Sequence, residues 1–288
     1  MSVGALWRGW RDVLGRLGFE TAALDAKLLA GHVLGMDSLA LATHEQRPVD
    51  EADALRLAEL MQRRMTGESV ARIIGEREFY GLAFGLNAAT LEPRPDTELL
   101  VDLALSALPA GGRLLDLGTG TGCISISILA NRSDASALAT DINPEALIMA
   151  RQNAERHGVA WRLDFARGDW FGAVPPGEAP FDLIVSNPPY IVSGVIETLA
   201  AEVKQFDPKL ALDGGPDGLV PYRIIAAEAP RFLRPGGQVL VEIGYDQGQS
   251  VAELFGHAGL ADIVVHKDLG GLDRVVCAHH LQSQISRP

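Results

Sequence analysis

Short apolar segments alternate with helix-forming segments from residue 112 onward, and few folds accept such a pattern. The apolar segments are rich in Leu, Val, Ile and Ala and have the length of buried strands. They are residues 112–118, 136–142, 161–169, 181–187 and 236–244. Helix-like stretches, such as residues 122–132 and 143–158, separate the early ones. Strands that alternate with helices predict a mostly parallel sheet with helices on both faces.

The end of the chain departs from this alternation. Residues 261–267 and 273–280 both have the pattern of strands, and only the short segment "DLGGL" lies between them. Such a link permits an antiparallel pair but is too short for a crossover helix. The expected fold class is therefore α/β, a doubly wound Rossmann-like sheet with an antiparallel last strand.

The first part of the chain has the pattern of a compact helical bundle. Apolar residues recur there at helical spacing in two segments. They are Leu6, Trp10, Val13, Leu14 and Leu17 in one, and Leu57, Leu60, Met61 and Met65 in the other. Residues 77–87, "REFYGLAFGLN", then alternate around Gly81 and predict a β-hairpin. We expect a helical domain at residues 1–75, a hairpin linker at 76–90 and a larger domain at 91–288.

The composition is that of an ordinary globular protein, with 47% hydrophobic and 22% charged residues. No apolar run has the roughly 18–20 residues of a membrane span, and the N-terminal segment lacks the apolar core of a secretory signal. Two cysteines, Cys123 and Cys277, do not suggest a disulfide framework. A cytoplasmic protein without a membrane partner is expected.

The charge balance bears on the choice of partner. The formal net charge is −12, and residues 91–288, with 15 basic and 25 acidic residues, carry −10 of it. A protein that binds a nucleic-acid backbone needs a positive surface that releases counterions. The acidic balance therefore argues against a direct nucleic-acid partner. The seven histidines show no metal-ligand spacing, and no metal site is predicted.

The segment "LLDLGTGTGCISI" places three glycines between a strand and a helix, where close backbone approach and free N–H groups favour a phosphate or nucleotide. The candidate cofactor-binding residues of this glycine loop are Gly118, Thr119, Gly120, Thr121 and Gly122. Asp141 closes the next strand, 19 residues after Gly122, where a carboxylate can accept hydrogen bonds from both hydroxyls of a ribose. The third glycine comes one residue earlier than in the dinucleotide fingerprint, so a nicotinamide dinucleotide and S-adenosylmethionine both remain open.

Two short motifs favour S-adenosylmethionine. The form D-x-G-x-G-x-G, which begins at Asp116, resembles the first motif of the Rossmann-like methyltransferases. The tetrapeptide "GDWF" follows the third strand, where Asp169 can accept from an adenine amino group and Trp170 can pack near its ring. An ordinary core aromatic is the alternative for Trp170.

A rigid tetrapeptide, "NPPY" at residues 187–190, ends the fourth strand, because prolines cannot donate to a sheet ladder. Ligands bind at this edge of open α/β sheets, next to the first loop. The side-chain carbonyl of Asn187 and the backbone carbonyl of Pro188 can accept both N–H groups of a planar nitrogen, which draws that nitrogen toward a tetrahedral geometry. Tyr190 can stack on the planar group. The motif therefore predicts methyl transfer to an amide or to the exocyclic amine of a nucleobase.

Nearly the whole chain resembles the release-factor glutamine methyltransferases, the PrmC or HemK family. The resemblance rests on "PRPDTE" at residues 93–98, on "NPPY", on the glycine loop, on the segments 67–102 and 206–219, and on the helical N-terminal part. It implies a class I methyltransferase that moves a methyl group from S-adenosylmethionine to a glutamine side-chain amide, leaving S-adenosylhomocysteine. The implied substrate is the Gly-Gly-Gln motif of peptide-chain release factors. The helical domain has no motif of its own, and we expect it to dock the substrate protein.

The resemblance also implies roles for individual residues. Cofactor binding is implied for Gly118–Gly122, Asp141, Trp170 and Asn187, beside Asp169. The substrate amide is implied at Asn187, Pro188, Pro189 and Tyr190, and Asn187, Pro188 and Tyr190 are the candidate catalytic residues. Arg94 and Thr97 are expected to lie over the cofactor or substrate. Asp207 stands where the family usually has glutamate, in a loop expected near the target.

Three alternatives would use the same fold. A dehydrogenase leaves "NPPY" unexplained, and an intact "NPPY" argues against a non-catalytic S-adenosylmethionine sensor. The strongest alternative is a nucleic-acid amino-methyltransferase acting on adenine or cytosine, which needs a basic groove and a pocket for a flipped base. The chain has its own Gly236-Gly237-Gln238, but this precedes an apolar strand and is expected to form a turn.

Overall fold

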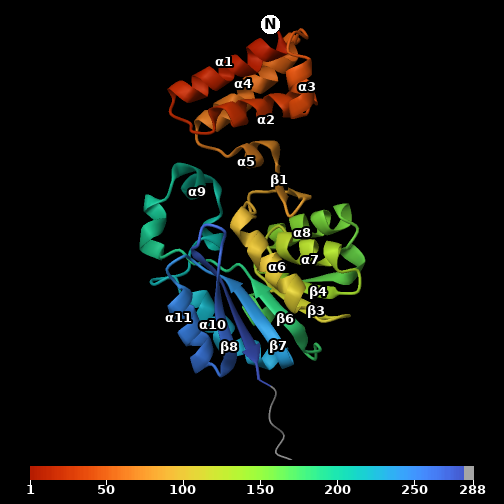
Figure 1. Ribbon diagram of the computed structural model, residues 1–288, viewed down its shortest axis with the longest axis vertical. Coiled ribbons are helices and arrows are strands. Elements are labelled where there is room, and N and C mark those ends of the chain that lie inside the picture. The colour runs from red at the N-terminus through yellow and green to blue at the C-terminus, as the bar shows by residue number, and fades with distance from the viewer. Residues whose placement is uncertain (282–288) are drawn as a thin grey trace, which may run out of the picture. The chain divides into compact units, whose positions relative to one another are not determined.

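The computed structural model describes residues 1–281 (Figure 1). The described residues divide into two compact units. The first comprises Met1–Glu76 with Ala201–Phe206, and the second comprises Arg77–Ala200 with the segment from Asp207 onward. The return of the chain to the first unit has no counterpart in the sequence patterns, because contacts between distant segments leave no local signal. The domain limits given above stay a prediction.

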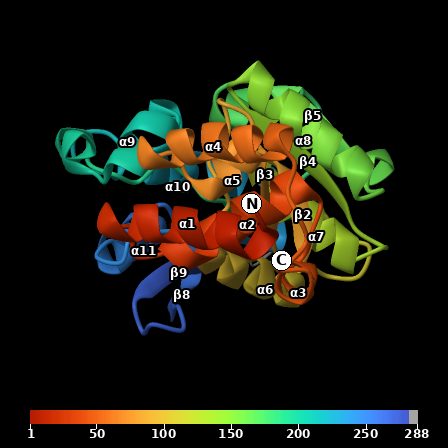
Figure 2. The ribbon, with the colours of Figure 1, turned by 90° about the horizontal axis from the view of Figure 1, so that it is seen from above.

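The first unit is helical. Its helices are α1 (Val3–Arg16), α2 (Ala22–Leu34), α3 (Ser38–Thr43), α4 (Glu51–Met65), α5 (Val70–Ile74) and α9 (Ala201–Phe206). Helix α2 contacts α1, α3, α4 and α5 (Figures 1 and 2). Of the expected apolar face of α1, Leu6 and Leu14 are buried, whereas Leu17 is 57% exposed. The buried ion pair of Asp25 with Arg64, at 2.8 Å, joins α2 to α4.

Side chains cap several of these helices. In each case a Ser or Asp before the helix accepts a hydrogen bond from a backbone N–H of the first turn. The capping residues are Ser2, Asp37, Asp50 and Ser69. These caps satisfy donors that have no partner inside the helix, so the short helices are defined locally by their sequence.

A β-hairpin follows, as predicted. Its strands are β1 (Glu76–Phe79) and β2 (Leu82–Gly85). Tyr80 and Gly81 both have positive φ, 53° and 71°, which is the backbone of a tight type I′ turn. Phe79 and Phe84 are buried, with their ring centroids 6.1 Å apart.

Within the described residues, seven strands form one sheet in the order β5-β4-β3-β6-β7-β9-β8. The strands are β3 (Arg113–Leu117), β4 (Ser136–Asp141), β5 (Leu163–Arg167), β6 (Phe181–Ser186), β7 (Leu233–Glu242), β8 (Leu260–Lys267) and β9 (Asp273–His280). Strands β3 to β7 pair with one another in parallel, and β9 is antiparallel to both β7 and β8. The predicted fold class, with its antiparallel last strand, is confirmed.

Helices cover both faces of the sheet. They are α6 (Glu98–Ala107), α7 (Cys123–Asn131), α8 (Pro144–Arg156), α10 (Val220–Phe232) and α11 (Gly248–His257). Leu114 of β3 packs with α6 and α7, and the next residue, Leu115, packs with α10 and α11, because side chains alternate across a strand. Figure 1 shows the two helix groups on opposite sides of the sheet.

Helix α10 is not among the elements expected from the sequence. Pro221 lies in its first turn and Pro230 near its end, so its apolar pattern is broken at both ends. Short 3₁₀ segments complete the chain: η1 (Pro95–Thr97), η2 (Ala160–Arg162), η3 (Trp170–Ala173), η4 (Ser193–Thr198) and η5 (Lys209–Ala211). Within residues 1–281, no helix is both long and apolar enough to cross a membrane.

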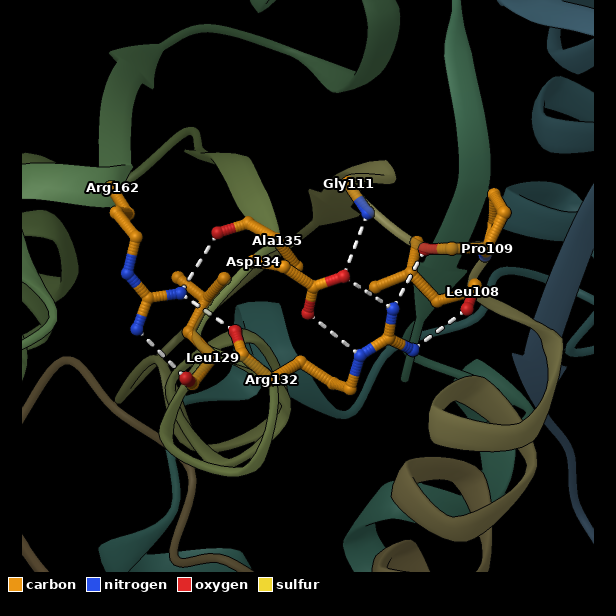
Figure 3. Close-up of polar contacts among 8 residues, drawn as sticks. All are labelled: Leu108, Pro109, Gly111, Leu129, Arg132, Asp134, Ala135 and Arg162. Carbon is orange, nitrogen blue, oxygen red and sulfur yellow. Dashed lines mark hydrogen bonds and ion pairs between the residues drawn. The ribbon is translucent and has the colours of Figure 1, made fainter.

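Two arginines join helix ends at the amino edge of the sheet (Figure 3). The Arg162 guanidinium donates at 2.8–2.9 Å to three backbone carbonyls around the end of α7, those of Leu129, Arg132 and Ala135. Arg132 donates to the carbonyls of Leu108 and Pro109, which follow α6, and pairs with Asp134 at 2.9 Å. Cations suit these positions, because helix C-termini expose unpaired carbonyls.

Replacing Arg162 by Met should lower the free energy of unfolding by about 2–4 kcal/mol, because several charge-assisted hydrogen bonds of about 1.5–3 kcal/mol are lost and water replaces them only in part. Urea unfolding measures the change. Arg231→Met, on the exposed side of α10, is the matched control and should cost less than about 0.5 kcal/mol. Equal effects would mean that Arg162 contributes no more than a surface charge.

Candidate active site

A cavity of about 450 Å³ opens at the carboxyl edge of the sheet, within the size range usual for cofactor sites. Its wall comes from the loops after β3, β4, β5 and β6, from "PRPDTE" and from residues 208–221. Most residues of the sequence-predicted site lie in this wall: Arg94, Thr97, Gly118, Thr119, Gly120, Thr121, Asp141, Asp169, Trp170, Asn187 and Pro189. Gly122, Pro188 and Tyr190 lie outside the wall formed by the described residues.

The glycine loop needs its glycines for two different reasons. Gly118, Gly120 and Gly122 all have left-handed φ values, of 72°, 56° and 81°. A Cβ on Gly122 would lie 2.7 Å from Cδ1 of Ile126, so this glycine permits close packing on α7. Gly118 and Gly120 have open space where a Cβ would stand, so a ligand can approach their backbone closely.

Asp141 ends β4 with each carboxylate oxygen held by a backbone donor. Oδ2 accepts from the N–H of Gly120 at 2.9 Å, and Oδ1 accepts from that of Asn143 at 2.8 Å. Burial raises the pKa of Asp141, while these backbone hydrogen bonds act in the opposite direction. Each oxygen keeps a further lone pair. The carboxylate can therefore accept from two neighbouring hydroxyls such as those of a ribose.

Trp170 begins η3 with a φ of 45°, which is uncommon for a large residue. Gly168 makes this turn possible, because a Cβ there would lie 2.7 Å from Cα of Ala173. Trp170 lines the cavity and also packs against the buried cluster between the sheet and α10. The side chain is therefore in part a core aromatic and in part available to a ligand in the cavity. Asp169 lies beside it in the wall.

The "NPPY" segment begins directly after β6. Asn187 is half-buried and lines the cavity, and its Nδ2 donates to Oγ1 of Thr97 at 3.2 Å. Pro189 also lines the cavity, whereas Pro188 is buried. Tyr190 packs partly against the cluster beneath α10 and α11, and burial raises the pKa of its hydroxyl to about 12.

A second loop closes tightly over the backbone of this segment. A Cβ on Gly214 would lie 2.8 Å from Cα of Tyr190, and one on Gly218 would lie 2.5 Å from its carbonyl oxygen. Gln247 of the loop before α11 donates to the carbonyls of Tyr190 and Gly218, at 3.1 and 3.2 Å. The glycines of "DGGPDGL" therefore allow close packing that fixes the path of "NPPY".

Arg94 and Asp207 connect two parts of the second unit that are distant in sequence. The guanidinium of Arg94 pairs with Oδ2 of Asp207 at 2.7 Å, and the Asp207 side chain is buried. Arg94 lines the cavity, and so does Pro208, which follows the aspartate. The aspartate that departs from the usual family residue thus holds the "PRPDTE" segment against the 208–221 segment.

Several wall residues have no counterpart in the sequence predictions. They are mostly apolar and include Leu91, Ile142, Leu210 and Val220. Ile142 carried a usable sequence signal, because it directly follows Asp141 at a strand end. The others come from loops that only the fold brings together.

Two buried carboxylates lie behind the site. Burial raises the pKa of Asp116 to about 6, although Thr119 and Ser125 donate to it, the Thr119 hydroxyl at 2.6 Å. Burial raises the pKa of Glu242, the last residue of β7, to about 7. Asp116 Oδ1 and Glu242 Oε2 have no hydrogen-bond partner within the described part of the chain. Strongly perturbed carboxylates beside a cavity are typical of functional sites.

The described residues contain no group of three or more His, Cys, Asp or Glu side chains arranged to hold a metal ion. Gln238 of the internal Gly-Gly-Gln sequence lies inside β7, paired with Leu183 of β6 and His279 of β9. It is a sheet residue rather than part of an exposed loop.

An open, mostly parallel sheet with an antiparallel last strand, whose glycine loop and acidic strand end face one cavity, has the architecture of the Rossmann-like methyltransferases. A methyltransferase from Pyrococcus furiosus has this fold: it is 19% identical, with a TM-score of 0.53 over 78% of this chain and 99% of that one. The family follows from closer relatives. Residues 5–75 match the PrmC N-terminal domain, and residues 95–206 match the methyltransferase small domain.

The release factor glutamine methyltransferase of Rhodospirillum rubrum is 48% identical to this chain, over 91% of this chain and 80% of the relative. That of Agrobacterium fabrum is 44% identical, over 92% and 93%. This chain belongs to the release factor glutamine methyltransferase family. The resemblance identified from the sequence is confirmed, and the nucleic-acid alternative is not favoured by these relatives.

Removing the charge of Asp116 should change how stability depends on pH. Its pKa is raised in the folded state, so its stabilising contribution is present below the unfolded pKa and is lost as pH rises through about 6. Asp116→Asn should therefore gain stability relative to wild type between pH 4 and pH 7, by on the order of 3 kcal/mol. Thermal unfolding across this range measures it, with the exposed Asp164→Asn as control. If the difference in stability between Asp116→Asn and wild type did not change with pH, the pKa of Asp116 would not be raised in the folded state.

Proposed function

We propose that this protein transfers a methyl group from S-adenosylmethionine to the side-chain amide nitrogen of the glutamine in the Gly-Gly-Gln motif of peptide-chain release factors. The names of its relatives support the substrate. The observation that carries the chemistry is Asn187, a polar amide at the rigid end of β6 that lines the cavity beside the glycine loop.

The residues of the cavity fit S-adenosylmethionine. The free lone pairs of Asp141 suit the ribose hydroxyls, and the open backbone at Gly118 and Gly120 suits the amino-acid part of the cofactor. Asp169 and Trp170 suit the adenine amino group and ring. When bound, the cofactor supplies an electrophilic methyl group on a sulfonium.

The chain's own groups prepare the accepting nitrogen. An amide nitrogen is a poor nucleophile, because its lone pair is delocalised into the carbonyl. The Oδ1 of Asn187 and the carbonyl of Pro188 accept its two N–H groups, and proline restricts the direction of the backbone carbonyl. Tyr190 stacks on the planar amide. The N–C bond forms as the S–C bond breaks, and the proton then released from nitrogen passes to water.

The helical domain at residues 1–75 is proposed to dock the release factor. It has no catalytic motif of its own, and its relatives' counterparts form a recognised N-terminal domain. The net charge of −10 on residues 91–288 disfavours binding to a nucleic-acid backbone.

The direct test is transfer of labelled methyl to purified release factors, followed by mapping of the modified residue. Label on the glutamine of Gly-Gly-Gln is expected. Label on another residue, or on DNA or RNA supplied in parallel, would overturn the proposal.

Asp141→Ala should weaken S-adenosylmethionine binding by a few kcal/mol, because hydrogen bonds to a charged group contribute about 1.5–3 kcal/mol each. NAD should not bind either protein. Calorimetry measures both affinities, and Asp164→Asn controls for loss of one negative charge. Equal affinity of wild type and Asp141→Ala would remove Asp141 from the site.

Asn187→Ala should reduce single-turnover methyl transfer by about 100–1,000-fold, since an acceptor that strengthens its contact in the transition state is lost. Cofactor affinity should change much less. Tyr190→Phe keeps the stacking face and should retain substantial activity. Asn131→Ala, at the end of α7, is the control. Near-wild-type transfer by Asn187→Ala would refute the role given to "NPPY".

A further inference from the structure

Three side chains from distant segments meet at the cavity wall, two of them in the wall and one behind it. They are Asn187 after β6, Thr97 of η1 and Glu242 at the end of β7. The parallel register explains the meeting, because Ser186 pairs with Val241 and the next residue of each strand is Asn187 and Glu242. Thr97 is 2% exposed and Glu242 is 1% exposed, so water does not compete for their hydrogen bonds.

These groups can form a relay, a chain of hydrogen bonds in which every donor points toward Glu242. An ionised carboxylate only accepts hydrogen bonds, so in the hydrogen bond between these two side chains the Thr97 hydroxyl is the donor and Glu242 the acceptor. The Thr97 oxygen then accepts from Nδ2 of Asn187, at 3.2 Å. Nδ2 of Asn187 also hydrogen-bonds toward Glu242. With its NH₂ group turned to Thr97 and Glu242, the Asn187 amide presents Oδ1 to the cavity.

We infer that Glu242 is a positioning residue, which through Thr97 fixes the Asn187 amide in the orientation that accepts hydrogen bonds from the methyl-accepting nitrogen. This inference rests on the proposed function for its consequence in catalysis, but not for the orientation itself. A rotated amide would present NH₂ groups to the N–H groups of the target, and no hydrogen bond could form.

The surroundings make the charge of Glu242 sensitive to pH. The charged groups that act on it are Arg274 and Asp96, and its own charge raises the pKa of the nearby Tyr190, Tyr222 and Cys123. Arg274 favours the charged form, but it also pairs with Asp96 at 3.1 Å and Asp268 at 3.0 Å, so its charge is shared. Burial dominates, and the pKa of Glu242 is about 7.

Protonation would reverse the relay. A neutral Glu242 can donate to Thr97, and the Thr97 hydroxyl can then donate to Oδ1 of Asn187, which turns the amide round. The productive orientation is thus expected above about pH 7 and is lost as pH falls below it.

The orientation is tested without any substrate. The side-chain ¹⁵N resonance of Asn187, identified by its absence in Asn187→Ala, is followed from pH 5.5 to 8.5 in the full-length protein. It should titrate with a midpoint near 7 in wild type and lose this transition in Glu242→Gln. Absence of a transition in wild type, or its persistence in Glu242→Gln, would overturn the inference.

The catalytic consequence is tested by single-turnover transfer to a release factor at saturating S-adenosylmethionine. The rate of methyl transfer by wild type should fall as the pH drops below about 7. Glu242→Gln should be slower by up to about 100-fold above pH 7 and should show no acid-side loss, because glutamine sets no direction. Cofactor affinity and melting temperature are measured alongside to separate misfolding from positioning.

Thr97 offers a matched pair of variants. Thr97→Ser keeps the hydroxyl and should behave like wild type, whereas Thr97→Val keeps the shape and should behave like Glu242→Gln. Equal rates of methyl transfer for Thr97→Ser and Thr97→Val would show that the Thr97 hydroxyl does not connect Glu242 to Asn187. A wild type that binds S-adenosylmethionine but methylates no release factor would instead contradict the proposed function and leave the resonance test standing.

Discussion

Parallel pairing of β3 with β4 and β6 is the constraint on which the site depends. The register aligns Leu117 with Thr140 on one side and Ser186 on the other, so all three strands end at one level. The backbone N–H groups of Gly118 and Thr119 then reach the Thr140 carbonyl at 2.9 Å, and the Ser186 hydroxyl reaches the Leu117 carbonyl at 2.7 Å. A one-residue slip would turn every side chain of a strand to the opposite face and separate these loops.

The carboxyl edge is costly to build. It contains two buried carboxylates, Asp116 and Glu242, each with an oxygen that lacks a partner among residues 1–281. Burial of a charge is unfavourable unless it is paired, and here the pairing is incomplete. At the amino edge, Arg132 and Arg162 instead satisfy carbonyls at the ends of α6 and α7. Stability and function are therefore separated to opposite edges of the same sheet.

Local pattern was enough to predict the sheet, and most of the site residues predicted from it lie in the cavity wall. Gly118, Asp141 and Asn187 each lie at a strand end, and parallel strands bring their ends together. The sequence did not predict features that depend on contacts between segments distant in sequence. Helix α10 has a proline near each end, which obscures its apolar pattern, and the pairing of Arg94 with Asp207 depends on how a long segment returns to the sheet. Periodicity contains no information about such closures.

Glu242 shows how a nonlocal residue could still be found. In "VLVEIG" a carboxylate ends an apolar strand, as Asp141 does in "SALATD", so both are candidates for the same edge. What separates their roles is strand order. β4 lies beside the glycine loop, and Asp141 faces the cavity, whereas β7 lies beside β6, and Glu242 stands behind Asn187. The same sequence signal thus leads to a proposed ligand-binding residue in one place and a proposed positioning residue in the other, because the neighbouring strand in the sheet differs.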